Sequence, residues 1–159
     1  MGQRTGAVAD LVNLAFWRDR RVLLTGHTGF KGGWLALWLR ELGARVTGIA
    51  LPPAGEPNLF ELVRLGEDID NRLLDIRAAD ALARAVRTAE PEVVFHLAAQ
   101  PLVCLSYAAP LATYATNVMG TVHLLDALRG LDCVRVAVMV ATDKVYLNRE
   151  WPWPYREDD

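Results

Sequence analysis

The feature that most constrains this chain is a cluster of glycines between two apolar segments. Residues 22–34 read VLLTGHTGFKGGW, so that Gly26, Gly29 and Gly32 follow a strand-forming run as G-x-x-G-x-x-G. In a dinucleotide-binding βαβ unit, the first glycine permits a tight turn, the second lets the backbone approach a pyrophosphate, and the third lets the helix pack closely on the strand. The pattern therefore predicts a phosphate-binding loop. A strand-to-helix turn without a ligand is the alternative.

Strand-like and helix-like segments alternate along the rest of the chain. We expect strands at residues 21–24, 45–51, 72–76, 93–97 and 134–141, helices at 6–17, 30–42, 78–88 and 110–129, and a loop with a short helix within 52–68. This alternation predicts parallel strands joined by helices, and the nearly continuous apolar strands indicate a sheet covered on both faces. The apolar residues of the helix at 30–42 cover most of its circumference, so we expect it to be buried on more than one face. The expected fold is α/β, a Rossmann-type doubly wound parallel sheet truncated after about five strands, with residues 1–159 forming one incomplete domain.

Composition excludes several classes of function. The chain is 52% hydrophobic and 23% charged with a net charge of −2, which gives no basis for binding nucleic acid or an acidic membrane surface. We expect neither a signal peptide nor a membrane span, because no apolar segment has the required layout or length. Cys104 and Cys133 form no CxxC pair, which predicts free, buried thiols in a reducing cytoplasm. His96 and His123 lack metal-ligand spacing, so we expect core or helix-face histidines and no metal site.

The acidic residue that usually holds the adenosine ribose is missing. It is expected about 20 residues beyond the glycines, where residues 50–53 read ALPP and offer neither an acid nor an arginine. The residues therefore leave NAD and NADP open. Asp75, at the end of the third expected strand, is the nearest well-placed acid, and capping of the following helix is its alternative role.

Six segments, taken together, resemble one family. They are TGHTGFKG at residues 25–32, LLDIRA at 73–78, FHLAAQPLV at 95–103, TYATNVMGTVHLL at 113–125, ATDKVY at 141–146 and NREWPWPYRE at 148–157. From about residue 16 onward the chain is similar to the N-terminal portion of the extended short-chain dehydrogenase/reductases, and within them to the CDP-glucose 4,6-dehydratase family. The resemblance implies an NAD-dependent hydro-lyase of deoxysugar biosynthesis, including that of lipopolysaccharide O-antigen.

The resemblance also implies which residues bind the cofactor. The loop residues that match the family's pyrophosphate cradle are Gly26, His27, Thr28, Gly29, Phe30, Lys31 and Gly32. Asp75 and Ile76 match a pair beside the adenine, and Asn117 matches a structural or active-site asparagine. The residues that match the cofactor-lining end of the fourth strand are Leu97, Ala98, Ala99 and Gln100.

The dehydratase signature matches Thr142, Asp143 and Lys144, which the resemblance implies are catalytic. In the implied reaction, hydride leaves C4 of the sugar for NAD+, water is lost across C5 and C6, and hydride returns to C6. Elimination needs an acid for the departing hydroxyl and a base for the C5 proton. Asp143 could act as the acid only if its pKa were raised, and Lys144 could act as the base only if its pKa were lowered. Thr142 would hydrogen-bond the C4 oxygen. Without the resemblance, Asp143 and Lys144 would be interpreted as a surface ion pair.

The catalytic Tyr-x-x-x-Lys pair of the superfamily is missing. None of the four tyrosines has a lysine four residues later, so we expect an N-terminal fragment, inactive alone, without the substrate domain. A truncated, non-catalytic nucleotide-binding module and a related epimerase or dehydratase are the alternatives. The implied partners are a nucleotide-sugar substrate, CDP-glucose, and further copies in a homo-oligomer.

Two smaller expectations follow from the same interpretation. Ser106 and Tyr107 are expected in a loop near the substrate, where Cys104 and Leu105 replace basic residues of the family pattern. An apolar sheet edge is expected to be exposed, which favours self-association.

Overall fold

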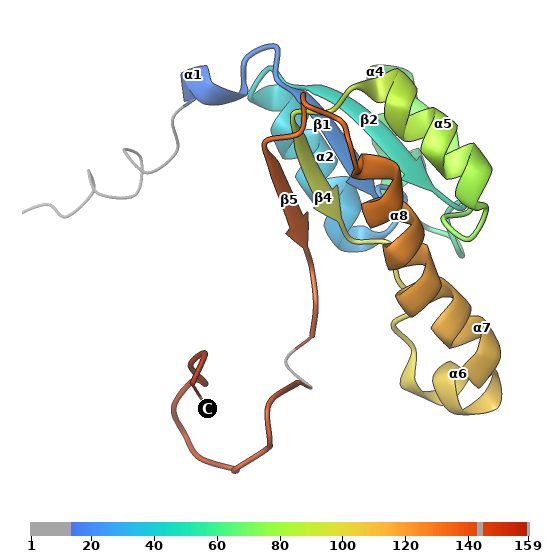
Figure 1. The fold of residues 1–159 in the computed structure, drawn as a ribbon, viewed down its shortest axis with the longest axis vertical. Helices are drawn as coiled ribbons and strands as arrows, with labels where there is room; N and C mark the ends of the chain where they lie inside the picture. Colours follow the sequence, from blue (N-terminus) through green and yellow to red (C-terminus); the bar gives the residue numbers. More distant parts are fainter. Residues whose placement is uncertain (1–13, 143–144, 159) are drawn as a thin grey trace, which may run out of the picture.

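The computed structural model describes residues 14–142 and 145–158, and its centre is a single parallel sheet (Figure 1). The strands are β1 (Arg21–Thr25), β2 (Arg45–Ala50), β3 (Asp70–Leu73), β4 (Val93–His96) and β5 (Val136–Met139). They lie in the order β3-β2-β1-β4-β5, and every neighbouring pair is parallel. The chain moves outward from β1 to β3 and then crosses to the other side of β1. This is the topology of a doubly wound sheet, so the predicted fold class is confirmed.

Helices cover both faces of the sheet (Figure 1). They are α1 (Leu14–Trp17), α2 (Phe30–Glu41), α3 (Leu59–Leu62), α4 (Leu65–Asp68), α5 (Ala79–Ala89), α6 (Val103–Ala108), α7 (Pro110–Tyr114) and α8 (Gly120–Leu128), with a π-helical segment η2 (Ala115–Met119) between the last two. The helix predicted over 6–17 lies mostly outside the described residues, and α1 is its last turn. In the described part of the chain, no helix combines the length and apolar character needed to cross a membrane.

The central strand β1 divides the core into two layers because its side chains alternate. Val22 and Leu24 pack with α2 and α4, whereas Leu23 packs with α5 and α8. Each of these three side chains is at most 1% exposed. Full burial on both faces is what a continuous apolar strand predicts.

The structure corrects two predicted elements. The third strand was expected at 72–76, but β3 ends at Leu73, because its pairing with β2 begins at Asp70 and reaches the end of β2 at Ala50. Ser106 and Tyr107 were expected in a loop and instead lie in the short helix α6, which directly precedes α7 (Figure 1). Pro101 and Pro110 bound this short helix, and no proline interrupts it.

Two burial predictions were wrong. The helix α2 buries one face, since Trp34 and Trp38 are 54% and 56% exposed. Their neighbours Ala36 and Leu39, by contrast, are fully buried. The cysteines are free, as expected, but Cys104 is exposed and Cys133 only half-buried.

Candidate functional site

A cleft with a volume of about 550 Å³ opens at the carboxyl ends of the strands. In doubly wound sheets this is where ligands bind, beside the point at which the strand order reverses. The lining residues come from the glycine loop, the ends of β2, β3, β4 and β5, and the π-helical segment: Gly26, Thr28, Gly29, Phe30, Lys31, Gly32, Ala50, Leu51, Leu74, Asp75, Ile76, Leu97, Ala98, Ala99, Pro101, Thr116, Val140 and Ala141. The volume lies within the range of small-molecule and cofactor sites.

The three glycines of the loop meet three different structural demands. Gly26 has a φ of +81°, and a Cβ there would lie 2.9 Å from Ala98 N. A Cβ on Gly32 would lie 2.1 Å from Gly26 O, so only glycine allows α2 to pack this closely on the turn. A Cβ on Gly29 would meet nothing nearer than Gly26 O at 3.4 Å. The middle glycine is therefore open toward the cleft, whereas the outer two are required by packing.

Backbone N–H groups at the start of α2 face this loop. The first helical hydrogen bond is Gly33 N to Gly29 O at 2.7 Å, so the N–H groups of Phe30, Lys31 and Gly32 precede it and have no acceptor within the helix. Gly29 is the N-cap and provides no side-chain acceptor. These donors, together with the positive end of the helix dipole, form an arrangement suited to a phosphate.

The His27 side chain lies beneath the loop and apart from the cleft lining. It is 0% exposed, its Nε2 lies 2.8 Å from Asn71 Oδ1, and its ring meets Phe60 edge-on at 5.5 Å. Burial lowers the pKa of His27, partly offset by the hydrogen bond with Asn71. A Cβ on Gly48 would lie 2.5 Å from His27 Cγ, so the glycine within β2 makes room for this imidazole.

Asp75 and Ile76 lie just beyond the end of β3, and both line the cleft. The Asp75 carboxylate accepts a hydrogen bond from Arg77 N at 2.9 Å and pairs with the Arg77 guanidinium at 2.6 Å, and this pairing holds the pKa of Asp75 below its usual range. The alternative role of Asp75 as a helix cap is wrong, because the N-cap of α5 is Ala78. Ala50 and Leu51 line the cleft where a ribose-binding acid is usual, and neither side chain carries a charge.

Asn117 and Gln100 lie outside the lining but hold one of its walls. Asn117 Oδ1 accepts from Gln100 N at 2.7 Å, and Asn117 Nδ2 donates to Gln100 O at 3.0 Å. The Gln100 side chain donates to Thr113 Oγ1 at 3.1 Å. These hydrogen bonds attach the segment after β4 to η2 through Asn117 and to α7 through Thr113.

Sequence reasoning missed several lining residues. Thr116 reaches the cleft from η2, and a π-helical turn left no recognisable signal in the sequence. Val140 and Ala141 extend from β5, and the general rule that ligands meet strand ends would have found them. Thr142 follows Ala141 directly, whereas Asp143 and Lys144 lie outside the described residues.

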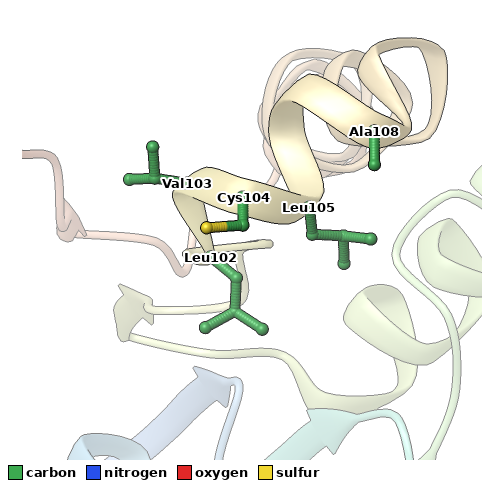
Figure 2. A pocket seen from close by; sticks show the side chains of 5 residues that line it. All are labelled: Leu102, Val103, Cys104, Leu105 and Ala108. Atoms are coloured by element: carbon green, nitrogen blue, oxygen red, sulfur yellow. The ribbon is translucent and has the colours of Figure 1, made fainter.

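A second hollow, of about 490 Å³, lies on α6 (Figure 2). Figure 2 shows its apolar lining, formed by Leu102, Val103, Cys104, Leu105 and Ala108. It shares no residue with the cleft, and its lining offers no charged group. Ser106 and Tyr107, expected near the substrate, lie on α6.

The doubly wound sheet, the glycine turn and the cleft at the strand ends together define a nucleotide-binding α/β domain. Comparison with known proteins narrows this class. The chain belongs to the GDP-mannose 4,6 dehydratase family, whose family model matches residues 23–158.

Among individual relatives, a CDP-glucose 4,6-dehydratase from Salmonella typhimurium is 50% identical over 149 residues. That alignment covers 94% of this chain and 42% of the relative, so the chain spans about two fifths of the length of that protein. The resemblance inferred from the six segments is confirmed.

Solved structures show the same fold. A UDP-glucose 4-epimerase from Stenotrophomonas maltophila, with bound NAD and a formylated UDP-arabinopyranose, has a TM-score of 0.72 at 25% identity, covering 84% of this chain and 40% of that one. A UDP-glucose 4-epimerase from Thermus thermophilus in complex with NAD has a TM-score of 0.63 at 30% identity, with coverages of 73% and 36%.

Proposed function

We propose that this chain is the NAD-binding part of a cytoplasmic nucleotide-sugar 4,6-dehydratase that converts CDP-glucose to CDP-4-keto-6-deoxyglucose. The observation that carries the proposal is the cleft, in which the glycine loop and four strand ends converge on one cavity. The identity of 50% to a CDP-glucose 4,6-dehydratase supports this substrate over other nucleotide sugars. Two cysteines without a disulfide are consistent with a reducing compartment.

The cofactor assignment rests on the fit of the cleft and on the neighbours. Both UDP-glucose 4-epimerases described above were solved with NAD. In this chain the open position at Gly29 and the free N–H groups at the start of α2 would receive the pyrophosphate. Ile76 and the uncharged Leu51 would lie along the adenosine half. When bound, NAD+ would supply reversible hydride acceptance.

The elimination chemistry is assigned to Thr142, Asp143 and Lys144. We assign a hydrogen bond to the C4 oxygen to Thr142, and proton transfer at C5 and at the departing C6 hydroxyl to the Asp143–Lys144 pair. The position of this signature supports the assignment, because Thr142 follows the cleft-lining Ala141 at the end of β5. Which of the pair is acid and which is base depends on their pKa values.

Binding and turnover test the proposal separately. Calorimetric titration of the 159-residue chain with NAD+ is expected to show weak binding, and no heat at millimolar NAD+ would contradict the cofactor assignment. The same chain, incubated with CDP-glucose and NAD+, is expected to yield none of the 4-keto-6-deoxy sugar chromophore, because it contains no Tyr-x-x-x-Lys pair.

The second candidate is a non-catalytic nucleotide-binding module. The DNA downstream of codon 159 separates the two. A continued reading frame that encodes Tyr-x-x-x-Lys favours the dehydratase, and the longer protein should then turn over CDP-glucose and lose that activity in Lys144→Ala. An immediate stop codon favours the module. Assembly of the longer protein as a homo-oligomer is part of the dehydratase proposal, and sedimentation would test it.

A further inference from the structure

A buried chain of hydrogen bonds runs from α8 to the end of β1 through the imidazole of His96. His96 is 4% exposed. Its Nε2 lies 3.0 Å from Thr121 Oγ1 on α8, and its Nδ1 lies 2.7 Å from Thr25 Oγ1 at the end of β1. The proposed binding function above makes no use of this histidine.

The partners of the two hydroxyls determine where each proton lies. Thr121 Oγ1 donates its single hydrogen to Asn117 O at 2.7 Å, because a carbonyl oxygen can only accept. Toward His96, Thr121 Oγ1 must therefore accept, so that His96 Nε2 carries a hydrogen.

At the other end, the hydroxyl oxygen of Thr25 already accepts from two backbone groups. Leu97 N and Ala98 N donate to it at 3.2 and 3.1 Å. Thr25 then donates its own hydrogen to the bare Nδ1 of His96, and each donor of the chain meets an acceptor.

A charged imidazole would break this pattern. A hydrogen on Nδ1 would become a third donor aimed at Thr25 Oγ1, and the hydroxyl hydrogen of Thr25 would lose its acceptor. The ring's hydrogen-bond partners on β1 and α8 are the hydroxyls of Thr25 and Thr121, and burial is what lowers the pKa of His96. Burial and hydrogen bonding thus favour the same neutral form.

The far end of the chain of bonds forms a wall of the cleft. Leu97 and Ala98 line the cleft directly. Their backbone also packs closely against the first glycine of the loop, since a Cβ on Gly26 would lie 2.9 Å from both Leu97 C and Ala98 N. A shift of this backbone would move the wall and the glycine turn together.

From this arrangement we infer that His96, locked as the neutral Nε2–H tautomer between Thr121 and Thr25, is a positioning residue that fixes the Leu97–Ala98 wall of the cofactor cleft. The effect on cofactor binding rests on the proposed function, whereas the tautomer does not. The two parts therefore have separate tests.

The tautomer is tested by long-range ¹H–¹⁵N correlation spectra of the 159-residue chain without ligand. We expect His96 to show a protonated Nε2 and an accepting Nδ1, unchanged at a pH about one unit below the ordinary histidine pKa near 6.5. An Nδ1–H tautomer, or ordinary titration in this range, would overturn the inference whether or not NAD+ binds.

The positioning role is tested with Thr121→Val, which keeps the shape of the side chain and removes the acceptor for His96 Nε2. We expect the amide resonances of Leu97 and Ala98 to shift and the Kd for NAD+ to rise about tenfold, as for the loss of one buried hydrogen bond. Thr121→Ser restores the hydroxyl and should return the Kd to within about twofold of the parent.

Thr88→Val provides the matched control. Thr88 Oγ1 donates to Arg84 O four residues back, as Thr121 does to Asn117, but it lies exposed on α5 away from the cleft. We expect this variant to leave the amide resonances of Leu97 and Ala98 unchanged, and likewise the Kd for NAD+. Unshifted Leu97 and Ala98 amides in folded Thr121→Val would overturn the positioning role. If the parent chain fails to bind NAD+, the amide shifts of Leu97 and Ala98 still test the positioning role of His96.

Discussion

Asn117 and Gln100 are joined by two hydrogen bonds in opposite directions. The amide oxygen of Asn117 accepts from Gln100 N at 2.7 Å, and its amide nitrogen donates to Gln100 O at 3.0 Å. Only a primary amide makes both bonds in this geometry. The pair links η2 to the segment that follows β4, and so controls the position of one side of the cleft.

We therefore expect Asn117→Asp to destabilise the fold. The carboxylate can still accept from Gln100 N, but Gln100 O loses its donor and faces a negative charge. The free energy of unfolding should fall by about 1–3 kcal/mol, which lowers the Tm by roughly 2–10 °C in a chain of this size. Thermal unfolding followed by circular dichroism measures the change.

Asn148→Asp is the control for this variant. Asn148 is exposed, and it accepts from Glu150 N and Tyr155 Oη through its amide oxygen, which a carboxylate replaces. We expect its effect to stay within about 0.5 kcal/mol. Equal destabilisation by the two substitutions would contradict the special role of Asn117.

Alanine substitutions at two loop glycines should separate folding from binding. In Gly32→Ala, the new Cβ would lie 2.1 Å from Gly26 O, a backbone atom that cannot move alone. The cost of about 3 kcal/mol for overpacking exceeds the gain of about 1 kcal/mol that alanine brings to a helix. Urea unfolding should therefore show a net loss of stability of about 2 kcal/mol.

Gly29→Ala is expected to behave in the opposite way. Its φ is −79° and the nearest atom to the new Cβ would be 3.4 Å away, so the stability should change by less than about 1 kcal/mol. The methyl group would occupy space at the mouth of the proposed phosphate site and weaken NAD+ binding at least about tenfold. Unchanged affinity for NAD+ would place the pyrophosphate elsewhere.

Stability should fall as the pH drops below the ordinary histidine pKa. Burial lowers the pKa values of His27 and His96 in the folded chain. The unfolded chain therefore binds more protons below about pH 6.5, so this stability is complete above that pH and is lost as the pH falls through the folded pKa values.

The slope of this loss has an upper bound of about 1.4 kcal/mol per pH unit for each histidine. Urea unfolding at intervals between pH 5.0 and 7.5 measures it, with the interval above pH 7 as the flat reference. A flat profile below pH 6.5 would show that neither imidazole is held neutral. Three carboxylates affect stability over a separate, more acidic pH range, because arginine and backbone partners lower their pKa values; they are those of Asp70, Asp75 and Glu92.

The edge of the sheet at β5 should promote self-association. In the order of the sheet β5 is terminal, and Val136 and Val138 are 48% and 39% exposed. An apolar edge strand with unpaired backbone groups is a template for pairing. We expect the 159-residue chain to sediment as more than a monomer, and Val138→Lys to shift it toward the monomer. A concentration-independent monomer in the parent chain would contradict this expectation.

Local patterns in the sequence determined most of the fold. The apolar runs predicted five strands, of which only the third lies earlier in the chain than expected, and the glycines at 26, 29 and 32 predicted the turn and the helix after it. These features depend on neighbours in the chain, because strand alternation and the φ of a glycine turn are local properties. The resemblance carried by the six segments then predicted the family.

Tertiary contacts decided the rest, because they join residues distant in sequence. His27 belongs to the glycine motif, yet Phe60 and Asn71 hold it beneath the loop. Gly48 gave no sign in the sequence that it faces His27. The proton positions around His96 depend on Thr25 and Thr121, which lie 71 residues before it and 25 after it. No local period encodes such contacts, so only the packing of β1, β4 and α8 against one another assigns these side chains their places.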